Sequence, residues 1–360
     1  MKTEHLLIIR FSALGDVAMT VPIVSALAHQ YPSLRITVLS RPFARVFFDG
    51  LAPNVGFMGA DLKGEYRGIK GLNALYRRLT AKNFTAIADF HAILRSSYLR
   101  MRFNIDRYRV EHINKHRAER RALTAPTPAK RLRPIPTAFE GYADVLARLG
   151  YPVKPQFTSI FTDNDGSLFS AIAPLTGTRA PGEAWIGIAP FAAHAGKVYP
   201  IEKMEQVIAL LGEQVPGCRL FLFGGGKDEQ EVFGRWQKQY SHCVNASERL
   251  GGLHGELVLM SRLDAMLSMD SANMHLASLV GTTVVSVWGA THPYAGFMGW
   301  NQSAANAVQL DLPCRPCSIY GNKPCLRADY ACLNGITPQS IVDHVKKALA
   351  KAEAEKAEER

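Results

Sequence analysis

A polar turn followed by a histidine lies inside segment 263–293 of this chain and has the residue types of an anion site. Asp270 and Ser271 form the turn after an apolar run, and a short helical pattern containing His275 continues to Gly281. The first turn of a helix has unpaired backbone N–H groups and the positive end of the helix dipole, which together favour a phosphate. The alternative is an ordinary strand–helix–strand unit with a serine N-cap and a solvated histidine.

A second loop of chemical interest, 289–293, follows the next apolar run at 283–288 and contains Thr291. Ligands of open α/β sheets bind beyond the carboxyl ends of the strands, and both loops are expected at such ends. We therefore expect the two loops to face one crevice.

A Gly-rich segment, 224–226, ends another apolar run and opens a helical pattern. It lacks the full Walker or dinucleotide fingerprint, so the motif alone does not define a phosphate loop. In a nucleotide-binding domain the loop would lie near the ribose or base, and Asp228 or Glu229 could bind ribose hydroxyls.

Two charged residues follow the first strands of the two halves of the chain. Asp16 comes after a Gly-containing turn, where its carboxylate could take a proton from a substrate or cap the helix that begins at Val17. Lys197 follows a turn rich in Ala and Gly, where its ammonium could neutralise charge on a departing diphosphate or remain a solvated surface group.

Four cysteines lie close together late in the chain, with the spacing C-x2-C-x7-C-x6-C. They are Cys314, Cys317, Cys325 and Cys332. Four thiols at this density could hold a structural zinc, although the second pair is not a second C-x2-C. Thiols or disulfides without a metal are the alternative, and a reducing cytoplasm disfavours disulfides.

The composition describes a globular protein with an uneven positive charge. The 360 residues carry a net charge of +11, and segment 95–133 holds twelve Lys and Arg residues. Such a segment implies an anionic partner, which could be a phosphorylated glycan, lipid headgroups or nucleic acid, or it is a solvated loop. Tyr98, Phe103 and Tyr108 leave nucleic acid open, because bases stack on aromatic rings. No apolar run reaches the roughly 20 residues of a membrane span and no secretory signal is recognisable, so we expect a cytoplasmic protein.

Apolar runs alternate with helical patterns in both halves of the chain, which predicts an α/β fold. Strands are expected at 6–11, 35–39, 85–90, 184–189, 219–223, 263–269 and 283–288, and helices at 17–29, 139–149, 201–214 and 229–240. The prolines of 125–136 predict a mobile loop. We expect two doubly wound parallel sheets facing a cleft, in domains 1–165 and 184–345, with a linker at 166–183 and a charged helical tail at 346–360.

Several separated motifs of this chain resemble one family, the lipopolysaccharide heptosyltransferases of glycosyltransferase family 9, which have the GT-B fold of two Rossmann-like domains. The motifs are 10–16 with Pro22, 89–96, Pro190 with 197–200, and 270–277 with 289–293. The resemblance extends from residue 6 to about residue 345.

The resemblance implies an inverting transfer of heptose from ADP-heptose to an anionic glycolipid of the lipopolysaccharide inner core, without a required metal or other cofactor. The acceptor would bind the N-terminal domain and the donor the C-terminal domain, on the cytoplasmic face of the inner membrane. By this resemblance Asp16 is the general base and Lys197 the phosphate-binding cation. The implied donor contacts are Asp270, Ser271, Ala272, Asn273, His275, Thr291, Gly225 and Asp228, and the implied acceptor contacts are Ser12, His91, Arg95 and Arg100.

Two positions depart from the pattern of this family. Ala272 stands where the family usually has Gly, and Ala290 where it usually has Pro. Both lie in the loops expected to shape the donor pocket, so another nucleotide-linked sugar stays open as the donor. A non-catalytic protein that binds a nucleotide sugar or nucleic acid is the remaining alternative, although the presence of both Asp16 and Lys197 argues against it.

Overall fold

The computed structural model describes residues 4–161 and 166–358. Residues 1–3, 162–165 and 359–360, at the ends of the expected first domain and of the tail, lie outside the described residues. The described chain forms two compact units, one within 1–115 and 136–160 and the other within 116–135 and 161–360. Segment 116–135 thus belongs to the second unit, whereas the sequence boundary left it in the N-terminal domain.

The described strands of the first unit form a parallel sheet in the order β3-β2-β1-β4-β5. They are β1 His5–Ile9, β2 Arg35–Ser40, β3 Val55–Gly59, β4 Ala86–Asp89 and β5 Arg109–His112. Central β1 pairs with β2 and with β4, and in the second pairing Ile9 is opposite Asp89. Because β1 is covered on both faces, its sequence is a continuous apolar run rather than an alternating one.

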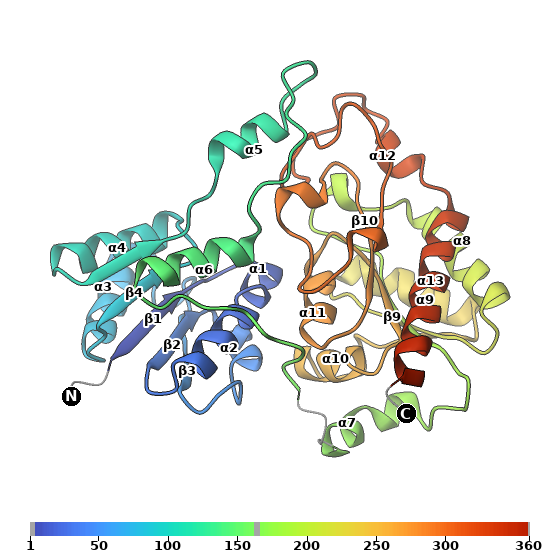
Figure 1. Cartoon of the computed structure of the whole chain (residues 1–360). Helices are drawn as coiled ribbons and strands as arrows, with labels where there is room; N and C mark the ends of the chain where they lie inside the picture. The colour runs from blue at the N-terminus through green and yellow to red at the C-terminus, as the bar shows by residue number, and fades with distance from the viewer. Residues whose placement is uncertain (1–3, 162–165, 359–360) are drawn as a thin grey trace. The chain divides into compact units, whose positions relative to one another are not determined.

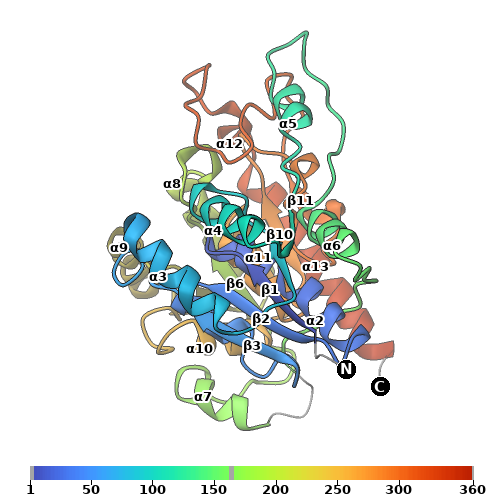
Figure 2. The same ribbon diagram turned by 90° about the vertical axis from the view of Figure 1, so that its left-hand side faces the viewer.

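Helices cover both faces of this sheet, with α2 and α6 on one side and α3 and α4 side by side on the other (Figures 1 and 2). The helices are α1 Leu14–Ala18, α2 Val21–Gln30, the 3₁₀ turn η1 Pro42–Phe47, α3 Gly68–Thr80, α4 Leu94–Ile105 and α6 Ala138–Arg148. The helix expected at 17–29 is therefore two helices. Pro22 lies in the first turn of α2, where a missing N–H costs nothing.

The described strands of the second unit form another parallel sheet, in the order β11-β10-β9-β6-β7-β8. They are β6 Trp185–Ala189, β7 Arg219–Leu222, β8 Cys243–Asn245, β9 Ala265–Met269, β10 Val284–Val287 and β11 Ala307–Val308. Side chains of β6, β7 and β10 pack with those of α8, α9 and α13 into one core. The predicted α/β class with two parallel sheets is confirmed.

The remaining helices belong to the second unit. They are α5 Arg117–Leu123, α7 Gly166–Thr176, α8 Ile201–Gln214, α9 Lys227–Gln239, α10 Leu253–Met260, α11 Ala272–Leu279, α12 Ala331–Asn334 and α13 Pro338–Glu358, with 3₁₀ turns η2 Ala195–Lys197, η3 Pro293–Ala295 and η4 Ala304–Asn306. Helix α13 begins before the expected tail, and Val345, Ala348 and Leu349 are buried. Its first half is therefore part of the core rather than a solvated end. In the described part of the chain, no helix is long and apolar enough to cross a membrane.

The basic segment 95–133 is divided between the two units. Its first part is α4 of the first unit, and from residue 116 onward it packs on the second unit. There the Lys130 ammonium donates to the carbonyl oxygens of Cys314 (2.9 Å) and Pro316 (2.7 Å), and Ile135 N–H donates to the Tyr294 carbonyl (3.0 Å). The proline-rich stretch at 125–136, expected to be a mobile loop, is thus held by hydrogen bonds at Lys130 and at Ile135.

Candidate functional site

Asp16 follows β1 and is held by two contacts inside the first unit. One oxygen, Oδ2, accepts a hydrogen bond from Ala13 N–H (3.1 Å) and lies 2.7 Å from an Nη of Arg10. Ala13 is the N-cap of α1, so Asp16 occupies the third helical position and not the N-cap expected in the alternative interpretation. The Asp16 side chain is 29% exposed and the Arg10 side chain 10%. The carboxylate is therefore the more accessible member of this pair.

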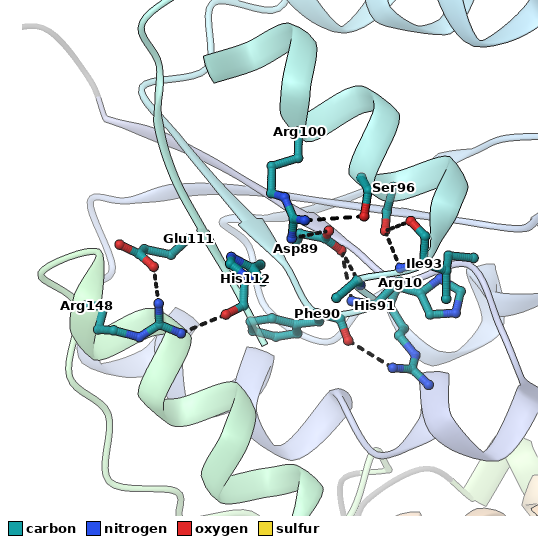
Figure 3. A network of polar contacts seen from close by, with 12 residues as sticks. Arg10, Asp89, Phe90, His91, Ile93, Ser96, Arg100, Glu111, His112 and Arg148 are labelled. Atoms are coloured by element: carbon teal, nitrogen blue, oxygen red, sulfur yellow. Dashed lines mark hydrogen bonds and ion pairs between the residues drawn. The ribbon is translucent and has the colours of Figure 1, made fainter. Parts of the chain in front are cut away.

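Arg10 fixes the geometry around this pair, although the sequence reading gave it no role of its own. Its other Nη donates to the Phe90 carbonyl at the end of β4 (2.8 Å; Figure 3). The guanidinium thus links the segment after β1 to the segment after β4. An arginine at the end of an apolar strand was the signal that could have revealed it.

His91 lies beside Arg10 and is buried. Its Nδ1 accepts a hydrogen bond from Phe11 N–H (3.3 Å), which places the proton of the neutral ring on Nε2. Burial, reinforced by the charge of Arg10, lowers the pKa of His91 to about 3. This histidine can therefore donate a hydrogen bond to a ligand at neutral pH but does not carry a positive charge.

Asp89, which ends β4, organises the other expected acceptor residues. It is fully buried, and Oδ1 accepts hydrogen bonds from the N–H groups of His91 and Ala92 (both 2.9 Å). Its Oδ2 lies 3.4 Å from an Nη of Arg100, so this arginine is already held by a carboxylate (Figure 3). Arg95, by contrast, is exposed on the first turn of α4.

The expected acceptor residues lie on two neighbouring segments. Ser12 is in the loop after β1, and His91, Arg95 and Arg100 follow β4, which pairs directly with β1. The carboxyl ends of neighbouring parallel strands meet at one edge of a sheet. The structure therefore places Asp16 and the four expected acceptor contacts at the same edge of the first unit.

Lys197 and Asp270 form an ion pair inside the second unit. The Lys197 Nζ lies 2.9 Å from Asp270 Oδ2, with side-chain exposures of 16% and 5%. Lys197 ends the turn η2 after β6, and Asp270 follows β9, which pairs with β6. The sequence interpretation placed Asp270 in the turn before the helix and among the implied donor contacts. In the structure it holds the lysine, and here the cation is the more accessible member.

The start of α11 lies next to this pair. Ser271 is the N-cap, but its side chain does not accept from the first turn and instead contacts the Ser268 hydroxyl (3.2 Å). Among the residues that the structure describes, no acceptor takes the N–H groups of Ala272 and Asn273. These amides can therefore bind an anion. His275 is buried one turn further on, so it is not the solvated histidine of the alternative interpretation.

The loop after β10 is tied to the turn that carries Lys197. Ala290 N–H donates to the Gly196 carbonyl (2.8 Å), a bond that a proline at this position could not make. The Ala290 carbonyl in turn accepts from the N–H groups of Cys317 and Ser318 (3.0 and 3.2 Å). Thr291 is fully buried, and its hydroxyl has no hydrogen-bond partner within the described chain.

Arg315 holds this loop through its carbonyl groups, and the sequence did not predict this role. The buried guanidinium donates from Nε to the Gly289 carbonyl (2.6 Å) and from Nη2 to the carbonyls of Trp288 (3.2 Å) and Thr291 (2.9 Å). Burial lowers the pKa of Arg315. The residue brings a cation to the loop expected at the donor site.

The Gly-rich segment is not an open phosphate loop in this structure. The N–H groups of Gly225 and Gly226 both donate to Oε2 of Glu229 (2.7 and 3.2 Å). A carboxylate therefore occupies the place where a phosphate would bind. Asp228 is exposed at the start of α9 and can still meet a ribose hydroxyl.

The late cysteines do not form a metal site. All six cysteines of the chain are free thiols, and within the described residues no group of three or more His, Cys, Asp or Glu side chains could hold a metal ion. Burial raises the pKa of Cys317, and it raises that of Cys332 to about 11. The arrangement therefore does not support the structural-zinc alternative.

Comparisons with known proteins give one consistent family. The model described as "Glycosyltransferase family 9 (heptosyltransferase)" matches residues 72–324. The lipopolysaccharide core heptosyltransferase OpsX of Haemophilus influenzae is 23% identical over 296 residues, which cover 81% of this chain and 80% of that protein. Lipooligosaccharide heptosyltransferase 2 of Campylobacter jejuni is 24% identical over 134 residues, and the match spans 36% of this chain and 40% of that relative.

Solved structures show the same fold over almost the whole chain. The E. coli heptosyltransferase WaaC with ADP has a TM-score of 0.66 at 18% identity and covers 96% of this chain and 99% of that one. A family 9 glycosyltransferase from Veillonella parvula has a TM-score of 0.69 at 17% identity, covering 98% of each chain. The predicted GT-B type fold is thereby confirmed.

Proposed function

The chain belongs to glycosyltransferase family 9, the heptosyltransferases, and on that premise we propose that it transfers a heptose from ADP-heptose to the inner core of lipopolysaccharide or a related cell-surface glycan. The structure of WaaC with ADP supports the choice of nucleotide, and the similarity to OpsX supports the choice of acceptor. The reaction would take place on the cytoplasmic face of the inner membrane.

The observation that carries the proposal is the Lys197–Asp270 ion pair beside the open first turn of α11. An ammonium and the N–H groups of Ala272 and Asn273 together offer a nucleoside diphosphate what it needs, a positive charge and several donors. We assign the donor to the second unit, with Ser271, His275 and Thr291 as further contacts. Asp270 would hold Lys197 in place until the diphosphate competes for it.

We assign the acceptor to the first unit and the role of general base to Asp16. The carboxylate would take the proton of the acceptor hydroxyl while its oxygen forms a bond to the anomeric carbon. The bond from that carbon to the diphosphate breaks on the opposite face, so the configuration inverts. Lys197 and the amides of α11 would stabilise the charge that grows on the leaving diphosphate, and no metal ion is required for this.

His91, Arg95, Arg100 and Ser12 would orient the acceptor. A neutral His91 can donate from Nε2 to a sugar hydroxyl, and the exposed Arg95 can bind a phosphate or carboxylate. Arg100 would act from its fixed position on Asp89. The three aromatic residues that left nucleic acid open do not form a stacking surface, because Phe103 is fully buried and Tyr98 and Tyr108 pack against the same core.

A thermal-shift panel of nucleotides and nucleotide sugars tests the donor assignment. A ligand present at 100 times its Kd stabilises the folded state by about 2.7 kcal/mol, so ADP and ADP-heptose should raise the melting temperature more than the UDP, GDP and CDP forms. A preference for UDP-sugars would overturn the donor while leaving the fold intact. A salt-sensitive electrophoretic shift with RNA or DNA, without any nucleotide effect, would favour the nucleic-acid alternative.

The stereochemistry of the product tests the mechanism. An inverting transfer gives a product whose anomeric configuration is opposite to that of the donor, and the anomeric NMR signals of donor and isolated product distinguish the two. A product with the same configuration as the donor would contradict single displacement and with it the role proposed for Asp16.

A further inference from the structure

The outward side of α4 is apolar, which is unusual for a helix at the surface of a globular protein. The inward side carries Leu99 and Phe103, which are fully buried in the core of the first unit. Leu94, Met101 and Ile105 are 88%, 48% and 66% exposed. At 100° per residue these three lie within about 40° of one another, directly opposite the buried side.

Helix α3 extends this apolar surface. The Asn73 amide oxygen accepts from the Tyr98 hydroxyl (2.7 Å) and from Arg102 (2.5 Å), so α3 and α4 lie side by side (Figure 2). Ile69, which is 67% exposed, lies one turn before Asn73 on the same side of α3. We call these four exposed apolar side chains the α3–α4 patch: Ile69, Leu94, Met101 and Ile105.

The two helices that carry the patch are basic. Helices α3 and α4 each carry three Lys or Arg residues and no carboxylate. Lys70, Arg77 and Arg95 are exposed, and none of them has an ion-pair partner among the described residues. An apolar centre flanked by unpaired cations is complementary to an anionic lipid surface, where the side chains enter the headgroup boundary and the cations meet phosphates.

We propose that the α3–α4 patch is the surface by which this protein rests on an anionic bilayer. Leu94, Met101, Ile105 and Ile69 enter the headgroup region, and Lys70 and Arg77 contact lipid phosphates. The inference rests on the proposed function in one respect: the proposed acceptor is a glycolipid, so the enzyme must reach it at a membrane surface.

Cosedimentation with lipid vesicles tests the proposal without donor or acceptor. The wild-type protein should bind vesicles of phosphatidylglycerol and phosphatidylcholine, and it should bind pure phosphatidylcholine vesicles far less. The variant Leu94→Ser/Met101→Ser/Ile105→Ser should bind the anionic vesicles at least about tenfold more weakly, because it loses three inserted side chains. Leu326→Ser is the matched control, since Leu326 is also largely exposed but belongs to the second unit. It should bind like the wild type.

A second variant tests the contribution of the cations to vesicle binding. Lys70→Glu/Arg77→Glu should weaken binding to anionic vesicles by about tenfold and reduce its dependence on salt. Vesicle binding that is unchanged in both multiple variants, or absent in the wild type, overturns the proposal. The wild type could instead be a dimer that becomes a monomer in the triple serine variant, with neither protein binding vesicles. That outcome would assign the patch to contact with a second copy of the chain.

Activity on a water-soluble, deacylated acceptor separates this inference from the proposed function. The triple variant Leu94→Ser/Met101→Ser/Ile105→Ser should turn over the soluble acceptor at the wild-type rate. It should lose activity only when the acceptor is embedded in vesicles. A wild-type protein that binds anionic vesicles but has no transferase activity on either acceptor would refute the proposed function and leave the membrane surface supported. Wild-type activity of the same triple variant on the vesicle-embedded acceptor would refute the membrane role of the α3–α4 patch and leave the proposed function supported.

Discussion

Asp16 with Arg10 in the first unit and Lys197 with Asp270 in the second are ion pairs just beyond the carboxyl end of a strand, and the acid is the accessible member in one pair and the cation in the other. In the first unit Asp16 is more accessible than Arg10, and in the second Lys197 is more accessible than Asp270. The buried member fixes the position of the accessible one in each case. The first unit therefore presents an accessible carboxylate, and the second unit presents an accessible cation.

In the mechanism proposed above, the two residue pairs serve opposite steps of one reaction. Deprotonation of an acceptor needs a carboxylate that a hydroxyl can reach, and departure of a diphosphate needs a reachable positive charge. Arg10 is anchored further by the Phe90 carbonyl, so it does not leave its place. The ammonium of Lys197 is on a flexible stem and can move from Asp270 to a phosphate.

Removing the accessible acid should have the largest effect. Asp16→Asn keeps an oxygen that can accept the Ala13 N–H but cannot take a proton, so kcat should fall about 10³-fold with little change in donor binding. Initial rates and calorimetric titration with ADP measure the two quantities. A kcat within tenfold of wild type would show that Asp16 is not the general base, and the contrast between the two ion pairs would then have no catalytic meaning.

Removing the accessible cation should come next. Lys197→Met keeps the apolar stem, which packs beside Gly321, and deletes the charge, so kcat/KM for the donor should fall about 10²-fold. Lys197→Arg is the matched control, and it should recover part of the loss because the charge returns. Equal rates for the Met variant and the wild type would show that Lys197 does not reach the diphosphate.

Mild acid should destabilise the protein through protonation of His91, which lies beside the Arg10–Asp16 pair of the first unit. Its folded-state pKa of about 3 lies below the ordinary value, so the unfolded chain binds more protons and stability falls as the pH drops below about 6.5. Between pH 7 and pH 5 the loss should be about 2 kcal/mol. Denaturant unfolding of wild type and His91→Gln at both pH values measures it, with the exposed His29→Gln as control. The same pH dependence in all three proteins would contradict this.

Releasing the accessible cation should have a smaller effect than deleting it. Asp270→Asn weakens the hold on Lys197 but leaves its charge, so kcat/KM should fall only about tenfold. In a double-mutant cycle with Lys197→Met the second substitution should add little, because both act through the same ammonium. Fully additive losses would mean that Asp270 contacts the substrate independently of the lysine.

Removing divalent metal should have no effect on the rate. Side chains and amides supply the positive charge at the diphosphate in the proposed mechanism, so excess EDTA should leave kcat within twofold of the untreated enzyme. Elemental analysis of the purified protein completes the test. A chelator-sensitive rate that added Mg²⁺ or Zn²⁺ restores would contradict the comparison, because a metal would then share the role given to Lys197.

The strands and helices with strong local patterns could be predicted from sequence, as α8 Ile201–Gln214 shows. The patterns failed where tertiary packing decides the outcome. Strand β3, with the sequence VGFMG, is weakened by two glycines, and α4 was obscured because its outward side is apolar. A helix with apolar residues on both sides shows no clear periodicity.

The residues of the candidate site could be named from sequence, but the contacts among them could not. Asp16, Lys197 and Asp270 were recognised from their motifs, yet the pairing of Lys197 with Asp270 joins positions 73 residues apart and follows from the order of β6 and β9. Arg315 could not be predicted, because it lies between cysteines whose spacing indicates metal binding. Its role depends on carbonyl groups that no sequence pattern displays.

The assignment of segment 116–135 to the second unit has a consequence for dissecting this protein. The chain passes from one unit to the other three times, near residues 115, 135 and 160. A fragment that ends at residue 160 would therefore carry a basic stretch deprived of its packing partners, while the complementary fragment would lack the Lys130 contacts. An independently folding first unit requires excision of 116–135 and a new join between its flanks, and a single proteolytic cut at any one crossing would leave the two units covalently connected.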